Sequence, residues 1–73
     1  MRIEVGQKYL MLGVEGVLEV SLVMANIVIL TRLIKGGTWT YSPSDVSWLI
    51  KGGGLVLLSE SEASAWTAYH HQM

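Results

Sequence analysis

The pentapeptide Leu-Ile-Lys-Gly-Gly occurs twice, at Leu33–Gly37 and at Leu49–Gly53, and its two settings decide the fold. The first copy follows the apolar run Ile27–Leu30 and precedes Thr38–Tyr41, so its glycines predict a hairpin turn between two strands. The second copy follows Ser42–Asp45, a helix-start pattern, so its glycines predict the end of a short helix. The same five residues therefore end two different elements, and together they place one helix inside a small β protein.

Alternating apolar and polar residues, bounded by turn residues, predict four or five antiparallel strands. Leu18, Val20 and Leu22 are expected to share one face of the second strand. Glu19 and Ser21 are expected to share its other face. The predicted fold class is α+β, a small antiparallel sheet with one short helix. The expected strands are Lys8–Leu12, Val17–Leu22, Ile27–Leu33, Thr38–Tyr41 and Leu55–Leu58.

The helix is expected over about Pro43–Lys51. Ser42 can cap it, and proline suits its first position because the missing N–H would be unpaired there anyway. Asp45 meets the positive end of the helix dipole and Lys51 the negative end. Gly52 is expected to take the left-handed conformation that closes the helix.

The chain of 73 residues is expected to form one compact domain over residues 1–58, followed by a flexible polar tail over residues 59–73. There is no cysteine, so packing alone must stabilise the fold. A helix of two turns is too short to persist without packing, and Val46, Leu49 and Ile50 are expected to face the sheet.

Composition argues against a membrane protein and against a nucleic-acid binder. The formal net charge is −1, and the five basic residues are scattered, whereas a nucleic-acid binder normally shows a basic stripe. The longest charge-free apolar stretch is too short to span a bilayer, and the first ten residues lack the apolar region of a signal peptide. We expect a cytoplasmic monomer that contacts neither membrane nor nucleic acid.

Catalytic chemistry is not predicted, and neither is a metal or another cofactor. The only histidines are His70 and His71, close to the chain end, where no fixed position is expected. Gly52–Gly54 follows a helix, whereas a phosphate-binding loop places its glycines before one. The chain is therefore expected not to be an enzyme.

Charged and aromatic residues outside the expected core are candidates for binding a protein partner. Glu15 and Glu19 could form an acidic patch, or could simply belong to a solvated face. Trp66 and Tyr69 could dock on a partner, or could pack back onto the sheet of this chain. The candidate partner-binding residues are Glu15, Glu19, Arg32, Lys35, Trp66 and Tyr69.

Trp39 and Tyr41 share one face of a short strand, and the sequence leaves open whether they belong to the core or to an exposed platform. As a platform they could stack on nucleotide bases, with Arg32 and Lys35 near the phosphates. A nucleic-acid-binding sheet is therefore the alternative function, and a structural phage subunit is another.

The strands before Thr38–Asp45, the helix-strand end Trp48–Leu58 and the short cysteine-free chain resemble the small RNA polymerase-binding transcription regulators of lytic Xanthomonas phages. The resemblance covers the whole chain. It implies inhibition of host promoter-dependent transcription by sigma-factor displacement, together with antitermination. The implied partners are the amino-terminal region of the largest polymerase subunit and the second-largest subunit, in the cytoplasm of the host cell.

A way of holding such a partner follows from the expected strand order. A first strand at Lys8–Leu12 would leave unpaired backbone groups at a sheet edge, where a partner segment could add as a further strand. Backbone hydrogen bonds would then fix the register, and nearby charged side chains would provide selectivity.

Overall fold

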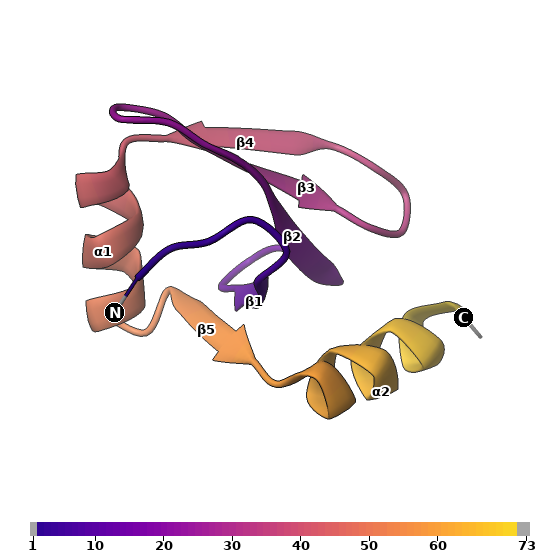
Figure 1. Cartoon of the computed structure of the whole chain (residues 1–73). Coiled ribbons are helices and arrows are strands. Elements are labelled where there is room, and N and C mark those ends of the chain that lie inside the picture. The colour runs from indigo at the N-terminus through magenta and orange to yellow at the C-terminus, as the bar shows by residue number, and fades with distance from the viewer. Residues whose placement is uncertain (1, 72–73) are drawn as a thin grey trace.

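The structure, a computed structural model, describes residues 2–71 and contains one five-stranded antiparallel sheet with two helices (Figure 1). The strand order is β4-β3-β2-β1-β5. The predicted α+β class, the strands and the first helix are confirmed. The elements are β1 (Lys8–Met11), β2 (Val17–Val23), β3 (Val28–Arg32), β4 (Thr38–Tyr41), α1 (Pro43–Lys51), β5 (Leu55–Leu58) and α2 (Glu60–His71).

The first four strands form a meander, and the fifth returns across α1 to pair with β1. Tyr9 of β1 lies opposite Leu18 on one side and Leu57 on the other. The predicted edge position of Lys8–Leu12 is therefore wrong, because both sides of this strand are paired. The edge strands are β4 and β5.

The main core lies between one face of the sheet and α1. Val46 of α1 is fully buried, and Leu49 and Ile50 pack against the same cluster, as predicted. α1 contacts both edge strands, β4 and β5, so it covers the side where the curled sheet is open (Figure 1). The buried members of this core are Tyr9, Met11, Leu18, Val20, Val28, Leu30, Val46 and Leu55.

Trp39 and Tyr41 are half-buried and pack against this core. The Tyr41 hydroxyl lies 3.8 Å from the sulfur of Met11. The Arg32 guanidinium lies 5.7 Å from the centre of the Trp39 ring. The open question is thus answered: the two rings line the core and do not form an exposed platform.

A β-bulge in β2 alters the predicted faces of that strand. Val20 lies opposite Leu30, but Leu22 lies opposite Ile29, the neighbouring residue of β3. The extra residue of the bulge moves Leu22 to the other face of the sheet, so the face predicted for Leu22 is wrong. The Ser21 hydroxyl at the bulge is 2.9 Å from the Thr31 hydroxyl, which links β2 to β3.

Both ends of α1 are capped by local hydrogen bonds. The Ser42 side chain accepts a hydrogen bond from the Asp45 backbone N–H at 3.1 Å, as the cap prediction requires. At the other end Gly52 keeps a helical φ of −85°, and Gly53 takes the positive φ of 82°. The predicted left-handed residue is therefore one position too early. The N–H groups of Gly53 and Gly54 bond back to Ile50 and Leu49, which completes the closing turn.

We expect Gly53→Ala to lower the free energy of unfolding by about 1–2 kcal/mol, because an L-residue is strained in the left-handed conformation. An added Cβ at Gly53 meets no atom within 4 Å, so the loss would be conformational. Gly52→Ala is the matched control, since its φ is helical. Urea denaturation should show a clearly lower free energy of unfolding for Gly53→Ala and little change for Gly52→Ala. Equal losses would show that the closing turn does not depend on this φ.

A second helix occupies residues 60–71, where a flexible tail was predicted, and that prediction is wrong for these residues. The reason is a capping box: the Ser59 hydroxyl accepts from the Glu62 N–H at 3.2 Å, and the Glu62 carboxylate accepts from the Ser59 N–H at 2.9 Å. Ala63 then packs against Val17 and Leu58 on the face of the sheet opposite α1. Residues 72–73 of the predicted tail lie outside the described part.

Acidification is expected to weaken α2. The hydrogen bonds from Ser59 favour the ionised carboxylate and lower the pKa of Glu62. A lowered folded-state pKa gives stability that is present at neutral pH and is lost as the pH falls through that pKa. Far-UV circular dichroism should show helix loss on acidification that Glu62→Gln removes and Glu60→Gln retains. The same acid transition in Glu62→Gln would contradict the role of this carboxylate.

Candidate interaction surface

Three of the residues expected to bind a partner come together where the β1–β2 and β3–β4 loops meet. The Lys35 ammonium lies 3.7 Å from the Glu15 carboxylate. Arg32 donates to the backbone oxygens of Gly36 at 2.8 Å and of Glu15 at 3.5 Å. These contacts hold the two loops against each other, and the charges of Lys35 and Glu15 face one another in an exposed pair.

Glu19 lies apart from this loop cluster. Its carboxylate is 3.0 Å from the ammonium of Lys8 on the neighbouring strand, on the face of the sheet opposite the main core. Glu15 and Glu19 are thus each paired with a different lysine. They do not form a joint acidic patch.

The two aromatic candidates near the C-terminus lie on α2. Trp66 is 40% exposed and has interactions within the protein. The backbone of Tyr69 belongs to α2, and its side chain lies outside the described part of the structure. Trp66 lies on α2 and not on the loop cluster, and Glu19 lies on β2, so the described side chains of the candidates come from three separate places in the fold.

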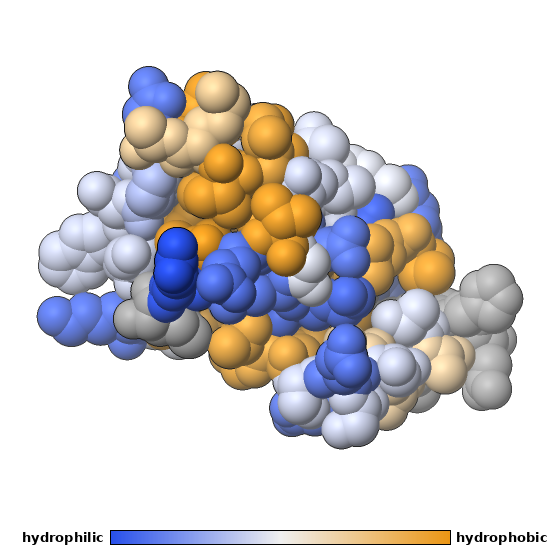
Figure 2. Space-filling view, in the orientation of Figure 1, coloured by the Kyte–Doolittle hydropathy of each residue, from blue (hydrophilic) through white to orange (hydrophobic). Residues whose placement is uncertain are grey.

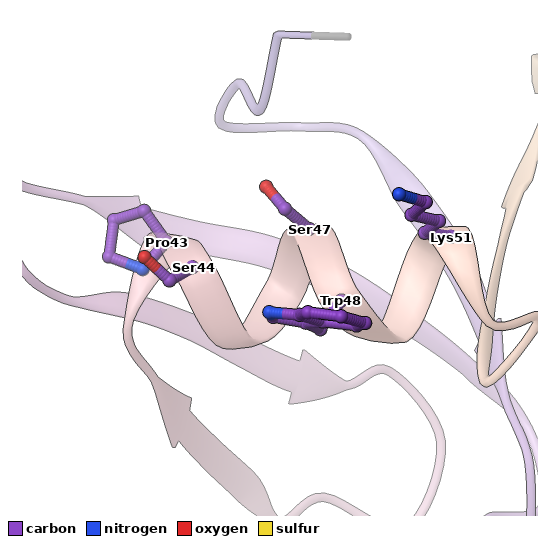
Figure 3. Close-up of a pocket in the computed structure, with 5 residues that line it drawn as sticks. All are labelled: Pro43, Ser44, Ser47, Trp48 and Lys51. Atoms are coloured by element: carbon purple, nitrogen blue, oxygen red, sulfur yellow. The ribbon is translucent and has the colours of Figure 1, made fainter.

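Apolar side chains remain exposed in several separate patches of the surface (Figure 2). Trp48 has a larger exposed fraction than Trp66: it is 73% exposed and lies on the outer side of α1. It lies among Pro43, Ser44, Ser47 and Lys51, around a shallow depression (Figure 3). We call these five residues the α1 outer face.

The indole of Trp48 lies on the surface of α1 and is mostly exposed. The ring lies along the helix surface between Ser44 at the amino end and Lys51 at the carboxyl end (Figure 3). The Lys51 ammonium is 5.8 Å from the ring centre, within the range of a cation–π contact. Because the opposite side of α1 is packed on the core through Val46, the ring is carried on a fixed support.

Trp48 was not among the residues selected from the sequence. The helical spacing indicated that Trp48 is exposed. Val46, Leu49 and Ile50 lie on the side of α1 that faces the sheet, so position 48 lies on the other side. A tryptophan in that position is a candidate contact residue, because large aromatic residues are enriched at the centres of protein interfaces.

Comparison with known proteins gives no relative: no protein-family model, no curated protein and no solved structure matches this chain. Among residues 2–71, no three His, Cys, Asp or Glu side chains are grouped so as to hold a metal ion. No helix in the same range is long and apolar enough to cross a membrane.

Proposed function

We propose that this chain is a phage protein that acts by binding host RNA polymerase, with the α1 outer face as a principal contact surface. The choice of partner follows the resemblance to the phage polymerase-binding regulators. In this proposal the protein inhibits host promoter-dependent transcription by displacing the sigma factor and promotes antitermination. It contacts the amino-terminal region of the largest subunit and the neighbouring second-largest subunit.

The exposed indole of Trp48 is the observation that supports binding of a protein. Burial of a tryptophan side chain removes roughly 150–250 Å² from water, and at about 25 cal/mol per Å² this favours a complex by about 3 kcal/mol when most of the ring starts exposed. α1 does not need this ring for its own packing, because Val46, Leu49 and Ile50 cover its buried side. Its free energy of burial is therefore available for a partner.

A contact of this kind suits a protein that regulates its partner by occupying a surface on it. A fixed aromatic side chain with a cation beside it, Trp48 with Lys51, can seat in an apolar pocket while the ammonium meets a carbonyl or carboxylate at the rim. A protein held in this way competes for a surface and performs no chemistry on it. Sigma-factor displacement is such a competition.

The alternative of a nucleic-acid-binding sheet is less well supported by the side chains. Trp39 and Tyr41 pack against the core, and Arg32 covers the Trp39 ring. Lys35 is paired with Glu15. Base stacking needs an open ring face and an uncompensated cation, so this arrangement disfavours base stacking on the face of β4.

The test is capture with the tagged full chain from two portions of a Xanthomonas lysate, one treated with nuclease and one untreated. We expect the polymerase subunits to be recovered, and transcription from a sigma-dependent promoter to fall when the purified chain is added. Recovery of nucleic acid without polymerase, with strong dependence on salt, would instead favour the alternative. Absence of polymerase and of any effect on transcription would overturn the proposal.

A further inference from the structure

The outer side of β5 carries backbone groups that point away from the sheet. The Leu12 N–H donates to the Gly54 oxygen at 2.9 Å, in line with the register that sets Val56 opposite Leu10. Because antiparallel strands alternate between bonded and unbonded pairs, Val56 and Leu58 direct their N–H and C=O groups toward β1, as Gly54 does with its C=O group. Leu55 and Leu57 therefore direct theirs outward.

The side chains of β5 do not protect this edge. The strand reads Leu55-Val56-Leu57-Leu58, with no charge, proline or bulge, which are the usual devices that keep edge strands from pairing. Val56 is 50% exposed and Leu57 is 39% exposed. In Figure 1 no strand lies beyond β5, and α1 and α2 meet it at its two ends. An edge of this composition is suited to a strand partner.

We propose that the occupant of this edge is β5 of a second copy of the chain, in antiparallel orientation about a two-fold axis. In the register with Leu55 opposite Leu57 of the other copy, all outward groups of both strands are used, and about four hydrogen bonds form. Val56 then faces its own counterpart on the axis. Both outward residues and the residue on the axis are apolar, so the interface is self-complementary.

Charge favours the antiparallel orientation with a second copy. Lys51 precedes β5, and Glu60 and Glu62 follow it. Antiparallel pairing sets the positive end of each copy beside the negative end of the other, whereas a parallel arrangement would join like ends. A four-residue strand buries less than the roughly 1,200 Å² of a standard stable interface, so we expect a weak dimer that depends on concentration.

This inference departs from the expectation of a monomer. It is independent of the proposed polymerase contact, because Trp48 lies on α1 and its depression includes no residue of β5.

The absence of cysteine in the chain allows a direct test. In an unbonded antiparallel pair the Cα atoms lie about 4.5 Å apart, within the range that a disulfide spans. We expect Val56→Cys to form a covalent dimer under mild oxidation at concentrations where the free chain associates. Leu12→Cys, at a position 85% exposed on the β1 side of β5 and not on its outer edge, is the control and should remain monomeric. No excess of dimer for Val56→Cys over the control would overturn the proposal.

Sedimentation equilibrium of the unmodified chain supplies the second measurement. We expect a reversible dimer that Leu57→Lys abolishes, because it places a charge at the edge. Leu22→Lys should leave the dimer intact, since Leu22 has the same exposure of 39% but lies on β2. A monomer at every concentration, or equal effects of the two lysines in folded variants, would contradict pairing through β5.

Discussion

Replacing Leu30 with alanine is expected to lower the free energy of unfolding by about 2–5 kcal/mol, the usual cost of a large cavity in a core. Leu30 is fully buried in β3, where it lies opposite Val20 of β2 and Trp39 of β4. Each of these neighbours packs on the same cluster, so a cavity here weakens contacts among three strands and α1.

The loss is large relative to the stability of so short a chain. At about 0.05–0.15 kcal/mol per residue, 73 residues have about 4–11 kcal/mol in total. Urea denaturation should therefore show a much lower midpoint for Leu30→Ala than for the natural chain. Leu12→Ala is the control, because Leu12 is 85% exposed, and its midpoint should hardly move. Equal midpoints for the two variants would contradict the assignment of the core.

The second large effect is expected on the affinity for the proposed polymerase partner. Trp48→Ala is expected to weaken binding to host core RNA polymerase about 30-fold, since truncation of a central aromatic contact costs about 2 kcal/mol or more. The fold should be retained, because Trp48 is mostly exposed and the buried side of α1 is unchanged. Affinity measured with purified polymerase checks this, and circular dichroism confirms that the variant is folded.

Trp66→Ala is the matched control for this measurement. Trp66 is also a helical tryptophan, is 40% exposed and lies on α2. If Trp48 is the contact residue, the Trp66 variant should bind nearly as well as the natural chain. A loss confined to Trp66→Ala would place the surface on α2, near one of the residues selected from the sequence.

Features set by neighbouring residues were predictable from the sequence. The first Leu-Ile-Lys-Gly-Gly segment forms the loop of the β3–β4 hairpin, and the second ends α1, as their flanks indicate. Ser42 caps α1 as expected from its place before Pro43. These signals are local because a turn or a cap depends on the backbone of only a few residues.

Features set by distant residues were not predictable. The pairing of β5 with β1 joins Leu55 to Met11, and no local pattern reports it. The same holds for the charges: Glu15 meets Lys35, and Glu19 meets Lys8, across turns and strands. Residues chosen as binding candidates for their charge are thus partly occupied within the protein.

Two further misses had signals in the sequence. The spacing of Ser59 and Glu62 is that of a capping box, but the polar composition around it was typical of a disordered tail, and within residues 60–68 of α2 only Ala63 is buried. For Trp48 the helical spacing indicated an exposed side, but exposure alone does not indicate a binding role.

The central claim, that this chain binds host RNA polymerase through the α1 outer face, is tested most directly by a competition measurement. Labelled sigma factor bound to purified Xanthomonas core polymerase is titrated with the natural chain and with Trp48→Ala. We expect the natural chain to displace the sigma factor and the folded Trp48 variant to require about 30-fold more protein for the same displacement. Failure of the natural chain to displace it, or equal displacement by the two proteins, would contradict the claim.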